Sequence, residues 1–249
     1  MKECLINVNN ISVSYGKIEA LRNLSLLIEK GDYIGVIGPN GGGKSTLIKT
    51  ILGLVKPCAG TIDYQGTNLK KSKIRMGYVP QINELNRYFP ITVNEVVLSG
   101  KLNSQIKPFF KYSKNDLEEV VNILDIVGLT DLKDRQICDL SGGEFQKMLI
   151  ARALIINPDV LLFDEPTAMV DLLSQRQILN LLKKLSNDIT IILVTHQVQE
   201  ITKHVKKLIF LNKNVIAEGQ PDEVYKYVYL NSAHNSIRKE YRKDVDVNA

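Results

Sequence analysis

Gly38-Pro39-Asn40-Gly41-Gly42-Gly43-Lys44-Ser45-Thr46 is the stretch that decides the fold of this 249-residue chain. It has the spacing G-x-x-x-x-G-K-[ST], in which a glycine-rich loop surrounds the phosphates of a nucleoside triphosphate. Residues 33–37 before it are apolar and predict a buried strand, and residues 47–52 after it have helical spacing that Gly53 ends. Because strand, loop and helix follow in this order, we expect a phosphate-binding site rather than an ordinary glycine-rich turn.

The chemistry expected of this loop follows from its residue types. Glycines let successive backbone N–H groups point inward at phosphate oxygens, and the following helix N-terminus adds partial positive charge. We expect all residues of the loop to bind the nucleotide. The Lys44 amino group should reach the β- and γ-phosphates, and the Ser45 hydroxyl should bind Mg²⁺.

Composition sets wide limits on the class of protein. Hydrophobic residues make up 44% and charged residues 24%, and the net charge of +5 permits an acidic partner without demanding nucleic acid. We expect no transmembrane segment, because the apolar runs are short, and no secretory signal at the N-terminus. Three widely spaced cysteines without a C-x-x-C pair are typical of a reducing compartment.

The N-terminal region predicts antiparallel strands. Residues 5–8, 11–15 and 24–28 alternate between apolar and polar, and we expect turns at 9–10 and 15–17 between them. Tyr15 comes at the end of one such run. Its ring could stack on an adenine base, but from this spacing alone Tyr15 is more often a half-buried strand residue.

Polar side chains follow three further apolar strands. Gln81 comes after residues 76–80, Asp164-Glu165 after 160–163, and His196 after 190–195. In an open α/β sheet, groups at the carboxyl ends of strands face the ligand crevice. Asp164 is the expected second Mg²⁺ anchor, and Gln81 could be a third ligand or an ordinary surface residue. Glu165 could polarise an attacking water, and His196 could hydrogen-bond the γ-phosphate.

Residues 83–152 predict an inserted helical subdomain. Thr92 with Glu95, and Ser113 with Asp116, have the spacing of capping boxes that open helices, and 101–114 predicts a loop. The second helix should end at Gly128 and bury one face. The residues expected on that face are Leu117, Val120, Val121, Leu124 and Val127.

A second candidate anion site comes at the end of this interval. Leu140-Ser141-Gly142-Gly143-Glu144 precedes a helix over 145–154, so a serine and two glycines stand at a helix N-terminus. Taken alone, the segment could be an ordinary N-cap. Since the chain already has a phosphate loop, the simplest function for a second one is to serve the nucleotide of another copy.

The remainder of the chain completes one domain. We expect an amphipathic helix over 172–185, a hairpin over 207–219 around residues 212–214, and a short helix after Pro221 that frays. The predicted division is a nucleotide-binding core with its β subdomain (1–82 and 153–222), the helical subdomain (83–152) and a C-terminal tail (223–249).

The order of these motifs along the chain resembles that of the ABC-type ATPases: the phosphate loop, Gln81, Leu140 to Glu144, Asp164-Glu165, Asp171 and His196. The resemblance covers nearly the whole chain. It implies an α/β fold, a P-loop NTPase (RecA-like) core with an N-terminal antiparallel β subdomain and an inserted α-helical subdomain. It also implies Mg²⁺-dependent ATP hydrolysis by a head-to-tail dimer.

The resemblance assigns further roles to individual residues. Tyr15 matches the aromatic residue that stacks on adenine, and Glu165 matches the general base. Asp171 matches the loop that crosses the dimer interface. The signature that closes over the partner's ATP corresponds to Ser141, Gly142, Gly143 and Glu144.

Within that family the chain looks most like the ATPase subunits of zinc- and manganese-type uptake transporters. The segments that carry this likeness are 41–44, 78–81 and 89–93. It implies integral membrane permease subunits, an extracytoplasmic substrate-binding protein and a location on the cytoplasmic face of the membrane. The helical interval that begins near Gln81 is the expected docking surface for the permease.

Three positions depart from the family pattern. Gln197 stands where Asp commonly follows the histidine, and Glu144 stands where Gln often ends the signature. Met169-Val170 is an unusual lead into Asp171. None of these changes removes a group that hydrolysis needs.

Two other classes of function compete with transport. An ABC-type ATPase of DNA repair or translation usually carries long coiled-coil insertions or paired nucleotide domains, and neither occurs in this sequence. A phosphate-loop kinase would need an acceptor pocket and would leave Ser141-Gly142-Gly143 without a function. Co-purification with an integral membrane subunit would discriminate the three.

Overall fold

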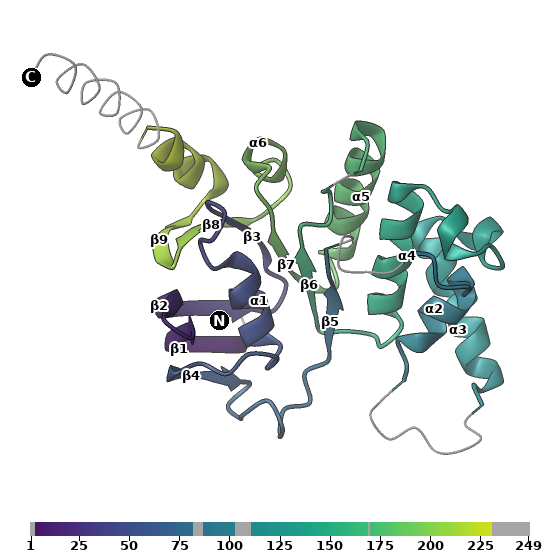
Figure 1. Ribbon diagram of the computed structural model, residues 1–249, viewed down its shortest axis with the longest axis horizontal. Helices are drawn as coiled ribbons and strands as arrows, with labels where there is room; N and C mark the ends of the chain where they lie inside the picture. The colour runs from purple at the N-terminus through teal and green to yellow at the C-terminus, as the bar shows by residue number, and fades with distance from the viewer. Residues whose placement is uncertain (1–2, 82–86, 103–110, 169, 231–249) are drawn as a thin grey trace, which may run out of the picture.

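The computed structural model describes residues 3–81, 87–102, 111–168 and 170–230. Figure 1 shows a central sheet, with a second sheet and one helix toward the N-terminal side and a group of helices on the opposite side. The predicted start of the helical interval at 83, the middle of the predicted loop at 103–110, Met169 and the tail from 231 lie outside the described residues.

The central sheet has the strand order β5-β6-β7-β3-β8-β9. Its neighbours are parallel except β9, which returns antiparallel to β8 as the predicted hairpin. Parallel strands covered on both faces should be apolar throughout, and β3, β6 and β7 are buried along their whole length. The strands are β3 (Tyr33–Ile37), β5 (Met76–Val79), β6 (Val160–Asp164), β7 (Thr190–Val194), β8 (Lys207–Asn212) and β9 (Asn214–Gly219).

One face of this sheet is covered by the N-terminal part of the chain. A second sheet of order β2-β1-β4 comprises β1 (Cys4–Tyr15), β2 (Ile18–Glu29) and β4 (Ala59–Tyr64), and it shares a core with α1 (Lys44–Ile51). The Tyr64 hydroxyl donates to the Ile51 carbonyl at 2.6 Å and so ties β4 to α1. Burial raises the pKa of this phenol to about 12.

The predicted turn at Asn9-Asn10 is wrong. These residues form a bulge inside β1, where the pairing with β2 shifts register between Val8 and Ile11 and Asn10 has a φ of 47°. The Asn10 N–H donates to Ser25 Oγ at 3.0 Å, and that hydroxyl donates back to Asn10 Oδ1 at 3.1 Å. Because β2 supplies partners for the extra residue, the strand continues instead of reversing.

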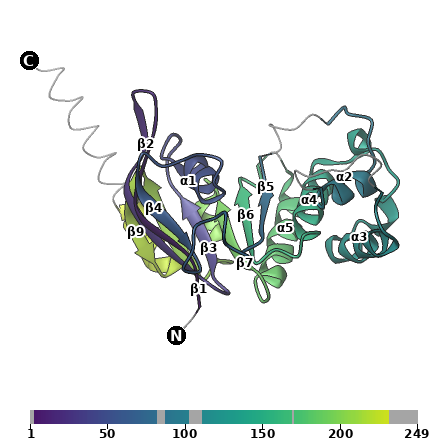
Figure 2. The same ribbon diagram turned by 90° about the horizontal axis from the view of Figure 1, so that it is seen from below.

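The other face carries the helices, as Figure 2 shows from below. Thr92, Ser113 and Ser141 each cap a helix through a complete capping box, as predicted for the first two. In the described residues no helix is long and apolar enough to cross a membrane. The helices are α2 (Val93–Ser99), α3 (Lys114–Val127), α4 (Gly142–Leu154), α5 (Leu172–Leu185) and the short α6 (Val198–Ile201), with 3-10 turns at Thr130–Leu132 and Ile137–Asp139 and a further helix over 221–230.

The predicted buried face of α3 is partly wrong. Leu117 and Val121 are each 44% exposed, whereas the unpredicted Ile123 is buried. The buried residues Val120, Ile123, Leu124 and Val127 form one helical stripe, in which each has another member three or four positions away. The two exposed leucine and valine side chains lie outside that stripe.

Candidate functional site

The phosphate loop needs its glycines for close approach to neighbouring backbone. A Cβ on Gly38 would lie 1.9 Å from the Leu211 carbonyl oxygen, and one on Gly43 would lie 2.5 Å from the Ala20 carbonyl oxygen. Gly43 also has a φ of 93°, which side chains disfavour. The loop is therefore pressed between β2 and the end of β8, directly before α1.

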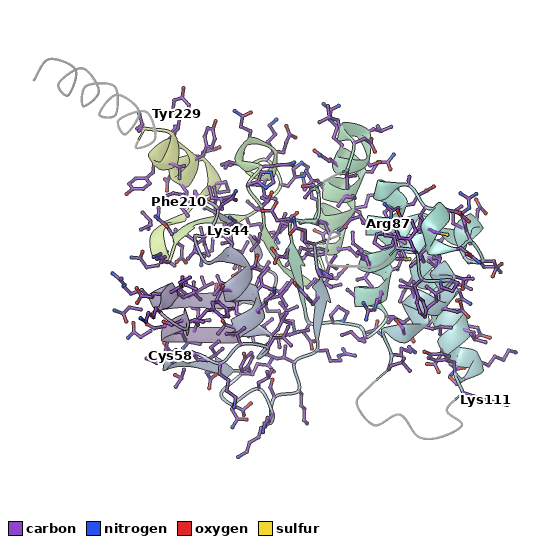
Figure 3. The ribbon with its side chains drawn as sticks, viewed as in Figure 1. Lys44, Cys58, Arg87, Lys111, Phe210 and Tyr229 are labelled. Carbon is purple, nitrogen blue, oxygen red and sulfur yellow. The ribbon has the colours of Figure 1, made fainter. Side chains whose placement is uncertain are left out.

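The lysine of the loop is held against it. Lys44 is only 7% exposed, and its Nζ donates to the carbonyl oxygens of Gly38 and Pro39 at 3.0 Å each. Figure 3 shows Lys44 in the middle of the molecule, where α1 meets the central sheet. A buried cation, glycine N–H groups and a helix N-terminus thus come together, as anion binding requires.

A cavity of about 590 Å³ opens beside this loop. Its volume lies in the range of small-molecule sites. It unites residues that are far apart in the sequence and that the sequence analysis assigned to one nucleotide site: Tyr15, which is 49% exposed, the loop residues, Gln81 and Glu165. The lining loop residues are Asn40, Gly41, Gly43, Lys44, Ser45 and Thr46.

Three oxygen-bearing side chains fit a magnesium ion. Ser45 Oγ donates to Asp164 Oδ1 at 3.0 Å, Asp164 is 3% exposed, and Gln81 lines the same cavity. Hydroxyl, carboxylate and amide oxygens together with phosphate are the donors that Mg²⁺ prefers. The described residues contain no cluster of three His, Cys, Asp or Glu side chains that could hold a metal without such help.

Glu165 and His196 form a pair at the carboxyl ends of β6 and β7. Glu165 has a φ of 54°, a strained conformation for a glutamate, and its N–H donates to the Val194 carbonyl at 3.0 Å. His196 Nδ1 lies 2.5 Å from Glu165 Oε2. Backbone strain and this contact together fix where the carboxylate points.

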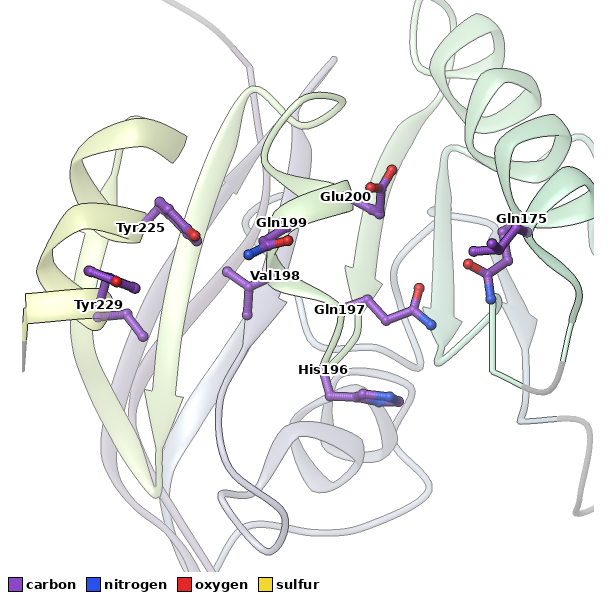
Figure 4. Close-up of a pocket in the computed structure, with 10 residues that line it drawn as sticks. Gln175, His196, Gln197, Val198, Gln199, Glu200, Tyr225 and Tyr229 are labelled. Atoms are coloured by element: carbon purple, nitrogen blue, oxygen red, sulfur yellow. The ribbon is translucent and has the colours of Figure 1, made fainter. Parts of the chain in front are cut away.

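A second cavity, of about 560 Å³, is lined by His196 and the residues that follow it (Figure 4). His196 lines this cavity and Glu165 lines the first, so the pair links them. The walls also include Gln175 and Gln197, and Tyr225 and Tyr229 from the helix over 221–230.

Gln197 ties the end of β7 to the loop before α5, and Gln175 ties the first turn of α5 to the same loop. Thr167 Oγ1 donates to Gln197 Oε1 at 3.1 Å, and Gln175 Nε2 donates to the carbonyls of Thr167 and Val170 at 3.1 and 2.7 Å. Asp171 ends this loop and caps α5. Hydrogen bonds to its carboxylate, the strongest from Ser174, lower the pKa of Asp171. Gln197, which replaces the usual Asp of the family, therefore still has a polar partner in the loop before α5.

The Leu140 to Glu144 segment lies apart from the phosphate cavity of its own chain. Glu144 Oε2 accepts from the Ser141 N–H at 2.8 Å, and hydrogen bonds from Ser141 lower the pKa of Glu144. A Cβ on Gly143 would lie 2.5 Å from Ser174 Oγ, so the segment is packed on the start of α5. None of Ser141, Gly142, Gly143 and Glu144 lines the cavity.

Four residues that no sequence pattern pointed to also line this cavity. Ile18, Glu19 and Ala20 come from β2, and Lys213 comes from the turn between β8 and β9. Lys213 N donates to the Gly42 carbonyl at 2.8 Å. No local sequence pattern predicts these residues. A hairpin predicted at 207–219, for example, does not show which residues its turn contacts.

Comparison with known proteins gives the family context of this site. A family model described as ABC transporter matches residues 21–168. The zinc uptake system ATP-binding protein ZurA of Listeria monocytogenes is 40% identical over 230 residues, covering 90% of this chain and 89% of ZurA. The manganese transport system ATP-binding protein MntB of Bacillus subtilis is 39% identical over 221 residues, covering 88% of each. A nucleotide-free ATP-binding cassette from an ABC transporter aligns with a TM-score of 0.80 at 28% identity, over 91% of this chain and 95% of that cassette.

Proposed function

This chain belongs to the ATP-binding subunits of ABC transporters, and from that premise we propose that it drives the uptake of zinc or manganese. Membership of the family makes it a transport-coupled ATPase that works with membrane permease subunits. The metal is inferred from relatives such as ZurA and MntB. The observation that supports the site best is one cavity that collects Tyr15, the phosphate loop, Gln81 and Glu165.

ATP binding is the first task of this cavity. The N–H groups of the phosphate loop and the amino group of Lys44 would bind the β- and γ-phosphates, and Tyr15 would stack on adenine. Ser45, Gln81 and Asp164 would hold the magnesium ion. When bound there, Mg²⁺ would neutralise negative charge between the β- and γ-phosphates.

Hydrolysis requires a water molecule in line with the γ-phosphate. Glu165 would accept a proton from that water as its oxygen bonds to phosphorus, and the bond to the β-phosphate oxygen would break to release ADP. His196, which touches the carboxylate at 2.5 Å, would keep it oriented toward the water. Positioning and charge stabilisation supply the rate in such reactions.

Two copies are needed to complete each site in this proposal. Ser141, Gly142 and Gly143 would close over the γ-phosphate of ATP held by a second copy, with Asp171 at the contact. Their position outside the cavity of their own chain favours this arrangement. The closed dimer would then depend on the γ-phosphate, because only the closed form binds it from both sides.

The transport partners follow from the same premise. We propose that the permease subunits dock on the helical part of the chain and place it at the cytoplasmic face of the membrane. A separate extracytoplasmic protein would deliver the metal ion to them. The proposed division of the chain is the one given by the sequence, with the helical part over 83–152.

Metal uptake by cells that express the transporter tests this function. Glu165→Gln should abolish uptake of radioactive zinc or manganese while the protein still co-purifies with its permease. Arg75→Met, a change to an arginine that is 55% exposed, serves as a matched surface control and should leave uptake intact. Uptake of both metals that persists at the normal rate in the Glu165→Gln strain would overturn the proposal.

A further inference from the structure

Arg87 connects the chain before α2 to the Leu140 to Glu144 segment. It follows Gln81 by six positions, and it contacts both sides of the Leu140 to Glu144 segment. Its Nη2 donates to the Leu140 carbonyl at 2.5 Å, and its guanidinium lies 4.6 Å from the centre of the Phe145 ring. Figure 3 shows Arg87 beside α4, far from Lys44.

The two partners of Arg87 lie directly on either side of the proposed signature. Leu140 comes directly before Ser141, and Phe145 comes directly after Glu144 in the first turn of α4. Both are fixed in the core, since Leu140 is 4% and Phe145 1% exposed. A guanidinium that donates to one residue and lies over the ring of the other therefore holds the intervening backbone at both ends.

The charge of Arg87 makes this contact unusual. A cation near a helix N-terminus is repelled by the positive end of the helix dipole, so the site needs compensation to keep it. The Leu140 carbonyl and the Phe145 ring face supply it. The cation also adds positive potential where Ser141, Gly142 and Gly143 would meet a phosphate.

The residues beside Arg87 face outward. Tyr88 is 89% and Phe89 59% exposed, next to the start of α2. A movement of this exposed segment would reach the Leu140 carbonyl through Arg87, beside the backbone hydrogen bond that the Ile137 N–H donates to the Ile91 carbonyl at 3.1 Å. Arginine suits this function because its planar group can stack and donate at the same time.

We propose that Arg87 is a positioning residue that sets the geometry of the signature loop and links it to the exposed Tyr88-Phe89 segment before α2. The inference rests on the proposed dimer, in which the signature of one copy acts on ATP held by the other. Arg87 touches no nucleotide in this account. Its effect should appear in turnover by the partner's site and not in nucleotide binding by its own.

A mixture of two disabled copies of the full-length chain tests this directly. Lys44→Ala removes the phosphate lysine and Ser141→Arg blocks the signature, so only a mixed dimer holds one complete site. Arg87→Met added to the Lys44→Ala copy, which supplies the working signature, should lower turnover by about tenfold. Added to the Ser141→Arg copy, it should lower turnover by less than about twofold. Equal effects in the two placements, or no effect in either, would overturn the inference.

Two further variants separate positioning from folding. Arg87→Lys keeps the charge but loses the stacked plane, so it should restore part of the turnover that Arg87→Met loses. Arg75→Met is the matched control and should change nothing in either copy. Nucleotide affinity measured in the absence of turnover should be the same in the otherwise unchanged chain and in its Arg87→Met, Arg87→Lys and Arg75→Met variants.

Backbone amide hydrogen exchange tests the effect of Arg87 on the signature loop even if the mixture of variants is inactive. An inactive mixture would refute the proposed dimer, whereas the local effect of Arg87 can be measured in the single chain. Arg87→Met should speed exchange at Gly142 to Glu144 by about threefold or more and leave the phosphate loop unchanged. Unchanged exchange in the signature loop would overturn the inference.

Discussion

In the proposed mechanism, turnover depends most on Glu165. An amide in place of its carboxylate cannot accept a proton, although its shape and volume stay the same. Glu165→Gln should therefore lower the rate of ATP hydrolysis by about 100-fold or more and leave ATP affinity within about twofold. Equilibrium binding of a fluorescent ATP analogue and a phosphate-release assay measure the two quantities. Hydrolysis by the variant at the normal rate would remove Glu165 from the mechanism.

Two glycines of the phosphate loop make a matched pair for testing its packing. Gly43→Ala places a methyl group 2.5 Å from the Ala20 carbonyl oxygen, whereas a Cβ on Gly41 meets nothing within 4 Å. Both have positive φ, so Gly41→Ala should lower the free energy of unfolding by only about 1–2 kcal/mol. Gly43→Ala should cost clearly more. Urea denaturation of both variants measures this, and equal losses would contradict the steric argument.

Single residues differ in how far a sequence can reveal them. The phosphate loop and Asp164 have local signatures, because strand, loop and helix position them within a few residues. Arg87 and Lys213 have none, since their partners come from distant parts of the chain. Tyr15 is intermediate: its strand is predictable, but only the folded sheet places it beside the phosphate loop.

At the scale of elements, α3 is anchored by a charged cluster at its N-terminus. Lys101 Nζ contacts Asp116 Oδ1 and Glu119 Oε2 at 2.5 Å each, and Asn157 donates to Glu119 at 2.8 Å. The hydrogen bond from Lys101, with further ones from Ser113, lowers the pKa of Asp116 from 3.8 to about 2. The ionised carboxylate thus favours the folded chain.

The pH dependence of unfolding tests this cluster. A carboxylate with a lowered pKa in the folded state stabilises above its ordinary pKa, and that stabilisation fades as pH falls from about 4 toward 2. Asp116→Asn should flatten the stability curve in this interval and lower stability at pH 7. Urea midpoints between pH 2 and 7 measure the effect. An unchanged acid slope in the variant would show that Asp116 titrates normally.

Elements are predicted best where the signal is local. The capping boxes at Thr92 and Ser113 can be predicted from the sequence because the capping residue and its partner are three residues apart. The bulge at Asn10 and the exposed side of α3 cannot be predicted in this way, because they depend on Ser25 and on the neighbouring helices. Tertiary partners overrule a local pattern in both cases.

At the scale of the whole molecule, the central sheet separates two regions with different functions. The face toward α1 carries the phosphate loop, and the opposite face carries the helices that present Ser141 to Glu144. A single chain cannot bring both to one nucleotide without leaving this fold. The proposal that a second copy completes each site rests on this separation.

The dependence of ATP hydrolysis on protein concentration tests that need most directly. If each nucleotide site is completed by the Ser141 segment of another copy, the rate of hydrolysis per molecule should rise steeply with protein concentration. It should then level off when nearly all molecules are dimeric. Ser141→Arg should abolish the rise while ATP binding persists. A rate per molecule that is constant over the whole concentration range, and that is unchanged by Ser141→Arg, would contradict the account.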